Sequence, residues 1–291
     1  MRMRFFKAHG LGNDYLALDL GELGFEPAPG AVRLLCDRNR GVGSDGVLAR
    51  VPSARADFGV RIFNPDGSEA EKSGNGLRIF AAYLLDLGAV REAVPFTVDT
   101  LGGLVTMTIL SVHADSLMVE AEMGRASFRS GDVGLAGPDR VVDGEMLELE
   151  AGDRVTINTV SVGNPHCVIF EDELDPEDLR RRAPQVSTHP FFARGTNVQF
   201  ARAVAPAAVE AWVWERGAGE TQASGSSACA VAAAAVRRGL VSERIVEVRM
   251  PGGDLHVTVG EDWSLTLRGP VEVVYRGELA AAFVSRLREL S

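Results

Sequence analysis

The amino-acid sequence predicts an α+β fold with two pseudo-symmetric domains, each a curled β-sheet around one central helix. Short strand-like runs bounded by turn residues fill most of the chain. One apolar, helix-forming run occurs in each half, at Gly76–Leu87 and within Gly217–Leu240. The length of 291 residues allows one or two domains with sizeable cores, and the similarity of the halves favours two.

The two helical runs belong to a supersecondary unit that occurs twice. Asp66–Gly88 and Gly217–Leu240 align so that the SGN sequence at 73–75 matches the SGS sequence at 224–226. In both copies a turn rich in small residues leads directly into an apolar helix. The alternative is a chance similarity between two helix starts.

The match extends on both sides of the helices. Asn64 and Glu215 lie nine residues before the two matching serines, and each follows an apolar, strand-like run. Downstream, a Gly-Gly pair precedes alternating residues in both halves, at Thr100–Ile109 and Met250–Val259. The order strand, turn, helix, Gly-Gly, strand therefore occurs twice, which indicates an internal duplication and not a solenoid.

In the first half, the spacing of apolar residues predicts helices at Ala31–Arg38 and Gly76–Leu87. Strands are predicted at Arg4–Lys7, Tyr15–Leu20, Val47–Val51, Phe58–Phe63, Phe96–Asp99, Leu104–Leu110 and Leu117–Ala121. Clusters of Gly, Asn, Asp and Pro predict turns at Gly10–Asp14, Gly41–Gly46 and Asn64–Gly67.

Arg125–Arg154 is polar with scattered glycines, and we interpret it as the connection between the domains. In the second half, helices are predicted at Pro176–Arg182, in the Ala-rich run closed by Gly239, and at Glu278–Leu290. Strands are predicted at Val155–Val162, Cys167–Phe170, Asn197–Ala201, Val209–Trp214, Ile245–Met250, Leu255–Val259, Ser264–Arg268 and Val271–Tyr275.

Composition argues against several classes of function. The net charge of −10 and the pI near 5.1 disfavour nucleic acid or an anionic membrane as the partner. No apolar stretch approaches a membrane-spanning length, and the N-terminus lacks the apolar core of a signal peptide. Three cysteines, Cys36, Cys167 and Cys229, are too few for a disulfide framework. We therefore expect a cytoplasmic protein with reduced thiols.

The two helix N-termini are the main candidate site. Backbone N–H groups in the first turn of a helix lack partners and, with the helix dipole, attract a carboxylate or phosphate. We expect Gly74, Asn75, Gly225 and Ser226 to hold a carboxylate in this way. The alternative is ordinary N-capping, for which Ser and Asn are favoured residues.

Polar residues at strand ends are further candidates. Arg216 can bind a carboxylate through two hydrogen bonds, and Glu215 can bind an ammonium group. The alternative for this pair is a surface ion pair. Asn64, Asn164 and Asn197 each lie at a strand end or a turn, where asparagine is common for backbone reasons.

His166 is the strongest candidate for a general acid or an orienting group. Cys167 is predicted to lie in the core, because neighbours on a strand point to opposite faces. Cys229 is also expected to be buried, and Cys36 has no supporting pattern. The other histidines lack the spacing of metal ligands, and no nucleotide-binding glycine pattern follows a strand. We therefore expect no metal and no cofactor.

The sequence resembles the diaminopimelate epimerase family, within a superfamily that also holds proline racemase-like and phenazine-biosynthesis isomerase-like proteins. The matching stretches occur in family order and are FFKAHGLGNDY, GVGSDG, FNPDGSEAEKSGNGLR, SVGNPHCV, GTNV and ERGAGETQASGSSACA. They extend from the first residues to about residue 230. The resemblance implies isomerase activity on LL-diaminopimelate, giving the meso form in lysine and cell-wall precursor synthesis.

In that family two cysteines act on opposite faces of the substrate α-carbon, without pyridoxal phosphate or metal. Both positions are serine here, at Ser73 and Ser224. A thiol has a pKa of about 8.5, whereas an aliphatic hydroxyl titrates far higher and needs an adjacent base to react. Two serines are therefore expected to be a very poor proton shuttle.

The resemblance also assigns substrate-binding roles. It implies that Asn13, Asn64, Asn164, Asn197 and Arg216 fix the distal amino-acid end of the substrate. Glu215 and His166 would hold the α-ammonium or tune the acid/base pair. Gly46 departs from the family, since many members have glutamine there.

The resemblance further implies two barrel-like domains, at 1–124 with a returning segment at 270–291, and at 125–269, with the active site in the cleft between them. Family members are often homodimers. Three functions remain open: an epimerase whose catalytic cysteines are replaced by serine, a natural serine variant with a different isomerase or dehydratase reaction based on Glu215, His166 or Glu220, and a non-catalytic amino-acid binder.

Overall fold

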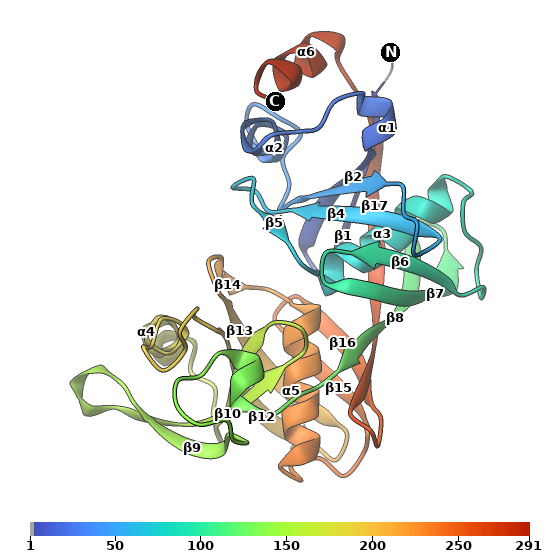
Figure 1. Cartoon of the computed structure of the whole chain (residues 1–291). Coiled ribbons are helices and arrows are strands. Elements are labelled where there is room, and N and C mark those ends of the chain that lie inside the picture. The colour runs from blue at the N-terminus through green and yellow to red at the C-terminus, as the bar shows by residue number, and fades with distance from the viewer. Residues whose placement is uncertain (1–2) are drawn as a thin grey trace. The chain divides into compact units, whose positions relative to one another are not determined.

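The computed structural model describes residues 3–291, except for the side chain of Ala151. The chain divides into two compact units (Figure 1). Unit 1 comprises Met1–Ala121 with Gly269–Ser291, and unit 2 comprises Glu122–Arg268. The boundaries of the units fall within two strands, β8 (Ser116–Arg125) and β17 (Ser264–Leu279).

Unit 1 is a closed ring of eight strands in the described part of the chain. Its order is β1 (Met3–Gly10), β2 (Asn13–Asp19), β3 (Val47–Val51), β4 (Phe58–Phe63), β6 (Phe96–Thr100), β7 (Gly103–His113), β8 and β17. The pairs β2–β3 and β4–β6 are parallel, and the other registered pairs are antiparallel. The ring closes because β17 pairs with both β1 and β8. Among the described residues, the eight-stranded ring itself therefore has no free edge.

Unit 2 repeats this order of pairings. It contains β10 (Arg154–Ser161), β11 (Pro165–Phe170), β12 (Asn197–Ala205), β13 (Ala208–Glu215), β15 (Ile245–Met250), β16 (Gly253–Val259) and the start of β17. The parallel pairs are again the second and the fourth, β11–β12 and β13–β15. The segment after β8 connects the two ends, since Ala126 N donates to Trp263 O at 2.9 Å and Ser127 bridges to Ser161.

One helix fills each ring. Helix α3 (Gly74–Asp86) is buried from Gly74 to Leu84. Helix α5 (Gly225–Arg237) is buried from Ser227 to Ala235. A helix enclosed by a sheet is buried on nearly all faces, which explains why these two runs are mainly apolar and lack the polar stripe of a surface helix. In α5 the interior residues are mainly alanines, whose small side chains allow the surrounding strands to approach closely.

The remaining elements lie outside the rings. In unit 1, residues of α2 (Pro29–Cys36) and α6 (Ala281–Glu289) share a buried cluster that includes Leu35 and Leu287. The other short elements are α1 (Leu20–Leu23), β5 (Glu69–Ala70), α4 (Pro176–Ser187), β14 (Gly219–Thr221) and two 3-10 turns at Ser130–Val133 and Glu150–Gly152.

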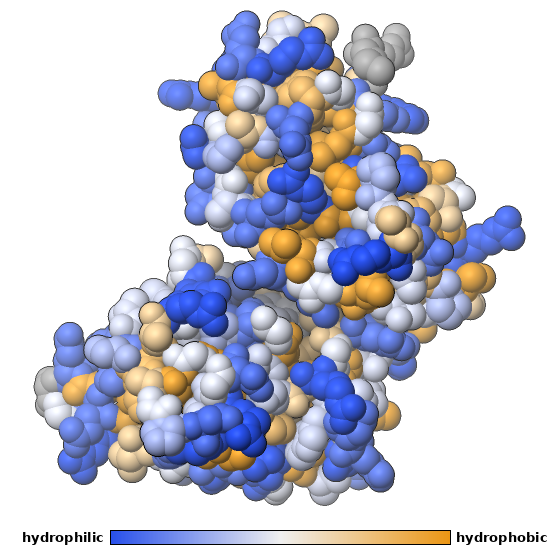
Figure 2. Space-filling model, viewed as in Figure 1, coloured by the Kyte–Doolittle hydropathy of each residue, from blue (hydrophilic) through white to orange (hydrophobic). Residues whose placement is uncertain are grey.

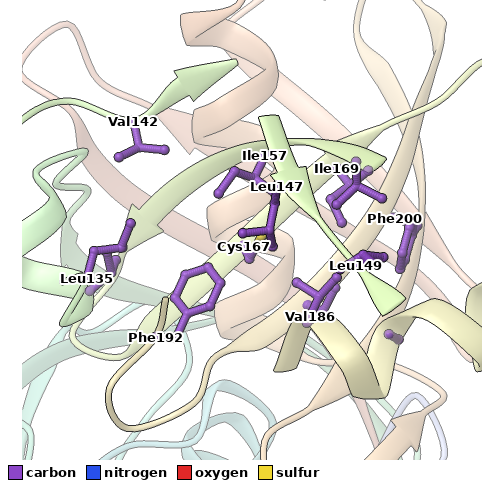
Figure 3. Close-up of a cluster of buried hydrophobic side chains, with 14 of the residues drawn as sticks. Leu135, Val142, Leu147, Leu149, Ile157, Cys167, Ile169, Val186, Phe192 and Phe200 are labelled. Carbon is purple, nitrogen blue, oxygen red and sulfur yellow. The ribbon is translucent and has the colours of Figure 1, made fainter. Parts of the chain in front are cut away.

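Residues 125–154 are not a linker, in contrast to our sequence-based interpretation. They contain β9 (Asp143–Glu148), which pairs with β10. Their apolar residues Leu135, Val142, Leu147 and Leu149 lie in the hydrophobic core of unit 2 with Phe200 (Figure 3). Polar residues alternate with these buried ones along the segment, so its average composition resembles that of a linker although one face is buried.

Most of the predicted helices and strands are present, although their ends are shifted. Some short elements of the structure were not predicted. The predicted strands Ser264–Arg268 and Val271–Tyr275 form one continuous strand, β17, and the C-terminal helix is shorter than Glu278–Leu290. No helix in residues 3–291 has the length and hydropathy needed to span a membrane. Figure 2 shows hydrophilic residues over much of the visible surface, with exposed apolar residues in scattered groups.

Candidate active site

Ser73 begins helix α3 in unit 1. Its backbone is extended, with φ −136°, and its Oγ accepts a hydrogen bond from Gly76 N at 3.0 Å. This is the geometry of an N-cap, as sequence reasoning allowed. The hydroxyl also lies 3.2 Å from Tyr15 Oη. Ser73 is therefore both a helix cap and one member of a hydroxyl pair.

Asparagine side chains surround this helix start. Asn75 Nδ2 donates to Asn13 Oδ1 at 3.2 Å, and Arg78, which is fully buried, donates to Asn75 Oδ1 at 2.9 Å and to Gly74 O at 3.1 Å. The structure thus places Asn13, Ser73, Gly74 and Asn75 together. Arg78 was not singled out in the sequence, although its position four residues after Gly74 on the helix was a signal for it.

A network of charges lies behind Asn13. Asp14 accepts from Arg38 and forms an ion pair with Lys7, both at 2.7 Å, and Asn13 Nδ2 donates to Asp45 Oδ2 at 3.2 Å. Burial favours the neutral form of Asp14, but hydrogen bonds from Arg38 and Lys7 outweigh it and lower the pKa of its carboxyl. This network fixes the turn that carries Asn13, and sequence reasoning missed it because its members come from separate segments.

Asn64 makes local contacts at the end of β4. Its Nδ2 donates to Ser68 Oγ at 2.9 Å, and its backbone N donates to Ser68 O at 2.8 Å. These contacts are the backbone role that asparagine commonly has in turns. A ligand role for Asn64 stays a prediction.

Ser224 begins helix α5 in unit 2 with the same extended backbone, φ −142°. In contrast to Ser73, it makes no side-chain cap hydrogen bond, and its Oγ lies 3.5 Å from Ser226 Oγ. The side chain is 5% exposed. Gly225 and Ser226 form the first turn, so the helix start offers backbone N–H groups as α3 does.

His166 is fully buried in a chain of hydrogen bonds. Gln199 Nε2 donates to His166 Nδ1 at 3.0 Å and to Ser227 Oγ at 2.9 Å, and His166 Nε2 pairs with Asn164 Oδ1 at 2.9 Å. Burial lowers the pKa of His166 to about 3. At neutral pH the imidazole is therefore uncharged, with the proton on Nε2 directed to Asn164. This favours the orienting role over the general-acid role that we considered for His166.

Asn197 links β12 to the end of β13. Its Nδ2 donates to Pro165 O at 3.0 Å, and its Oδ1 accepts from Arg216 N at 2.9 Å. The Arg216 guanidinium donates to Arg194 O at 3.1 Å. Burial raises the pKa of the Glu215 carboxyl. Among the described residues no Glu215–Arg216 ion pair is formed, so the surface ion pair weighed in the sequence is absent there.

Strand pairings place residues of the two units at matching positions. Leu16 on β2 pairs with Val47 on β3, which pairs with Phe63 on β4. In unit 2 the same steps join Cys167, Val198 and Trp214. The residues that precede Leu16 and Cys167, Tyr15 and His166, therefore occupy equivalent positions. The alignment also matches Asn13 with Asn164 and Asn64 with Glu215.

The three cysteines are free and buried. Cys167 lies in the core of unit 2 with Ile157 and Ile169, and burial raises its pKa (Figure 3). Cys229 is fully buried in α5, and Cys36 is 6% exposed. Among the residues described, no group of His, Cys, Asp or Glu side chains has a metal-binding arrangement.

The fold is similar to those of several solved structures. The hydroxyproline epimerase of Agrobacterium vitis, solved with bound trans-4-hydroxy-L-proline, has a TM-score of 0.70 at 18% identity, with 96% of this chain and 93% of that chain covered. A Bacillus anthracis phenazine biosynthesis protein of the PhzF family has a TM-score of 0.66 at 15% identity, with 96% and 99% covered. At these identities the likeness concerns the fold.

Sequence comparisons are more specific. "Diaminopimelate epimerase 2" of Nostoc sp. is 44% identical over 279 residues, with 96% of each chain covered. "Diaminopimelate epimerase" of Pelotomaculum thermopropionicum is 41% identical over 278 residues, with 95% of this chain and 98% of that protein covered. Residues 5–129 and 158–274 match the family described as diaminopimelate epimerase. Since these matches extend over nearly all of both units, the chain belongs to the diaminopimelate epimerase family.

Proposed function

We propose that this chain is a cofactor-independent amino-acid epimerase that binds diaminopimelate and acts on its α-carbon, interconverting the LL and meso forms. The observation that carries this proposal is the serine at the N-cap position of the central helix in each unit, in a chain related at 44% identity to a diaminopimelate epimerase. Each helix start supplies backbone N–H groups for an α-carboxylate. Asn13, Asn164, Asn197 and Arg216 supply amide and guanidinium groups for the distal end.

The proposed chemistry is a two-base proton transfer at positions 73 and 224. One group removes the α-proton, and the other delivers a proton to the opposite face. Serine hydroxyls are far weaker at this task than thiolates, because the alkoxide population near neutral pH is negligible. We therefore expect that this chain binds diaminopimelate but converts LL to meso very slowly at neutral pH.

The test is stereochemical conversion of LL-diaminopimelate, followed by NMR, in the parent and in the Ser73→Cys/Ser224→Cys double variant. The proposal expects binding by both proteins, measured by calorimetry, and rapid conversion by the double variant alone. A double variant that binds diaminopimelate without converting it would favour a non-catalytic amino-acid binder. No binding by either protein would refute the substrate assignment.

The raised pKa of Glu215 favours a second candidate, an isomerase or dehydratase of the same superfamily that acts on a more acidic C–H bond. A carboxyl with a raised pKa is a better general base than an ordinary one. Turnover of an activated substrate by the parent, abolished in Glu215→Gln, would support this candidate. His166 is less suited to act as a base, because burial holds its pKa near 3.

We also propose a cytoplasmic location, which is supported by three buried free cysteines and the absence of disulfides among the described residues. Under this proposal the partners are small amino acids, not nucleic acid or membrane, and sedimentation analysis would show whether the chain forms the homodimer that the family resemblance implies.

A further inference from the structure

Tyr15 lies beside Ser73 in unit 1. The Tyr15 Oη and Ser73 Oγ atoms are 3.2 Å apart, and the tyrosine is 7% exposed. Gly76 N donates to the same Ser73 Oγ at 3.0 Å. Within residues 3–291 these two groups are the hydrogen-bonding partners of Ser73 Oγ.

The two contacts of Ser73 Oγ leave one of its lone pairs without a hydrogen bond. A hydroxyl has one proton to donate and two lone pairs. When Gly76 N–H occupies one lone pair and the serine proton points to Tyr15 Oη, one lone pair remains. Since Ser73 is only half-buried, this lone pair can accept a proton from a bound ligand.

Gly46 makes room for the tyrosine ring. A Cβ atom at Gly46 would lie 2.5 Å from Tyr15 Cε1 and 2.6 Å from Phe63 O, closer than any real contact of this kind. The ring therefore occupies space that a side chain at position 46 would need. The glycine at this position and the tyrosine beside the serine are thus two parts of one arrangement.

Among the described residues of unit 2, no hydroxyl pair with an acidic partner matches the pair of Tyr15 and Ser73. His166 stands at the position equivalent to Tyr15, but it is engaged with Asn164 and Gln199. Ser224 Oγ instead faces the hydroxyl of Ser226 at 3.5 Å. The hydroxyl of Ser226 is as weak an acid as that of Ser224. Ser226 therefore provides no favourable acceptor for the proton of Ser224.

We propose that Tyr15 is a positioning residue that takes the proton of Ser73, so that Ser73 accepts the α-proton of a bound amino acid without becoming an alkoxide. This inference rests on the proposed function, because it requires an amino-acid α-carbon at Ser73. It adds a base that a serine at position 73 otherwise lacks.

The step balances in protons and electrons. The α C–H bond breaks, its electron pair stays on the α-carbon, and its proton forms an O–H bond at Ser73. The original Ser73 O–H bond breaks, and that proton joins the phenolate of Tyr15. Negative charge moves from the phenolate to the carbanion. The reverse step returns deuterium to the same face of the α-carbon only after the new hydroxyl proton on Ser73, as well as the phenol proton of Tyr15, has exchanged with D₂O.

The test is α-hydrogen exchange in D₂O, measured by NMR on LL- and meso-diaminopimelate between about pH 7 and about pH 10. The parent is expected to show exchange with retention that rises about tenfold per pH unit below the phenol pKa. Tyr15→Phe is expected to lose about 10²- to 10⁴-fold in exchange rate. Tyr83→Phe is the matched control, since Tyr83 is a buried tyrosine of the same unit whose ring packs against Phe6 and Phe80.

Rescue separates proton transfer from a structural role. A thiolate at position 73 needs no relay, so Ser73→Cys and Ser73→Cys/Tyr15→Phe are expected to exchange at similar rates. Equal exchange by the parent and Tyr15→Phe would overturn the relay, as would a parent that is silent at every pH while the double cysteine variant converts substrate. Failure of the double cysteine variant to act would instead refute the proposed function.

Discussion

The two helix starts share a backbone and differ in the surroundings of their serines. Ser73 caps its helix through Gly76 N and contacts the phenol of Tyr15, whereas Ser224 makes no cap hydrogen bond and contacts the hydroxyl of Ser226. The equivalent of Tyr15 in unit 2 is His166, which orients Asn164 instead. The duplication therefore preserved the fold and the helix N-termini while the residue beside each serine took a separate role.

Single cysteine variants provide the largest expected contrast between the units. Ser224→Cys keeps the Ser73–Tyr15 pair of unit 1 and adds a thiol in unit 2, while Ser73→Cys keeps Ser224, which has no acidic hydroxyl beside it among the described residues. We expect Ser224→Cys to convert LL to meso at least about 100-fold faster than Ser73→Cys near pH 9. This factor is the low end of the rate enhancement that a positioned acid or base provides. Circular dichroism of the converted product measures this rate, and equal rates would contradict the difference between the units.

Buried residues at matched helix positions give a contrast in stability. Arg78 in α3 and Cys229 in α5 each follow the cap serine by five residues, and both are fully buried. Arg78→Met removes the guanidinium hydrogen bonds to Gly74 O and Asn75 Oδ1 and is expected to cost about 3 kcal/mol. Cys229→Ala removes one buried sulfur and is expected to cost about 1 kcal/mol. Urea unfolding followed by fluorescence compares the two, and similar losses would show that Arg78 is not a structural anchor.

His166, the equivalent of Tyr15 in unit 2, is expected to make the stability of the protein depend on pH. The folded-state pKa of about 3 lies below the unfolded value near 6.5, so the unfolded chain binds the extra proton first. Stability from this group is therefore complete above about pH 6.5 and falls as the pH drops toward 3. At pH 5 the loss is about 2 kcal/mol relative to pH 7. The unfolding free energy is measured at both pH values for the parent and for His166→Asn. The drop from pH 7 to pH 5 should be larger in the parent by this amount. Equal drops in the two proteins would disprove the low pKa of His166.

The smallest contrast concerns capping. Ser73→Ala removes the bond to Gly76 N and is expected to cost about 1 kcal/mol of stability. Ser224→Ala removes no cap hydrogen bond and is expected to change stability by less than about 0.5 kcal/mol. Thermal unfolding of the two variants gives the comparison. A larger loss for Ser224→Ala would mean that its hydroxyl supports α5 in a way that differs from capping.

The sequence predicted well the elements whose pattern is local. Val47–Val51, Phe58–Phe63 and Ile245–Met250 have the predicted ends, because turn residues or a change of polarity bound each run. Residues 125–154 were misinterpreted because their buried residues are dispersed among polar ones. Their core role depends on packing against distant strands, which composition does not reveal.

For the site, the sequence located the helix starts and missed Tyr15. The Tyr15–Ser73 contact joins residues 58 apart in the chain, and no local pattern signals it. The duplication did contain a usable signal. Extending the alignment upstream from Asn64 and Glu215 would have matched Tyr15 to His166, a residue that was already singled out, and would have suggested a role for both.

Strand β17 has a consequence for how the protein is made. Unit 1 begins the chain, yet its ring needs the segment after Gly269 to join β1 to β8. During synthesis on the ribosome, β1 and β8 therefore remain open edges until the segment after Gly269 has been translated. Residues of unit 2 emerge completely before that moment, so the C-terminal unit can close first. The usual N-to-C order of domain folding is thereby reversed, and the nascent N-terminal half is the segment that depends on protection from aggregation.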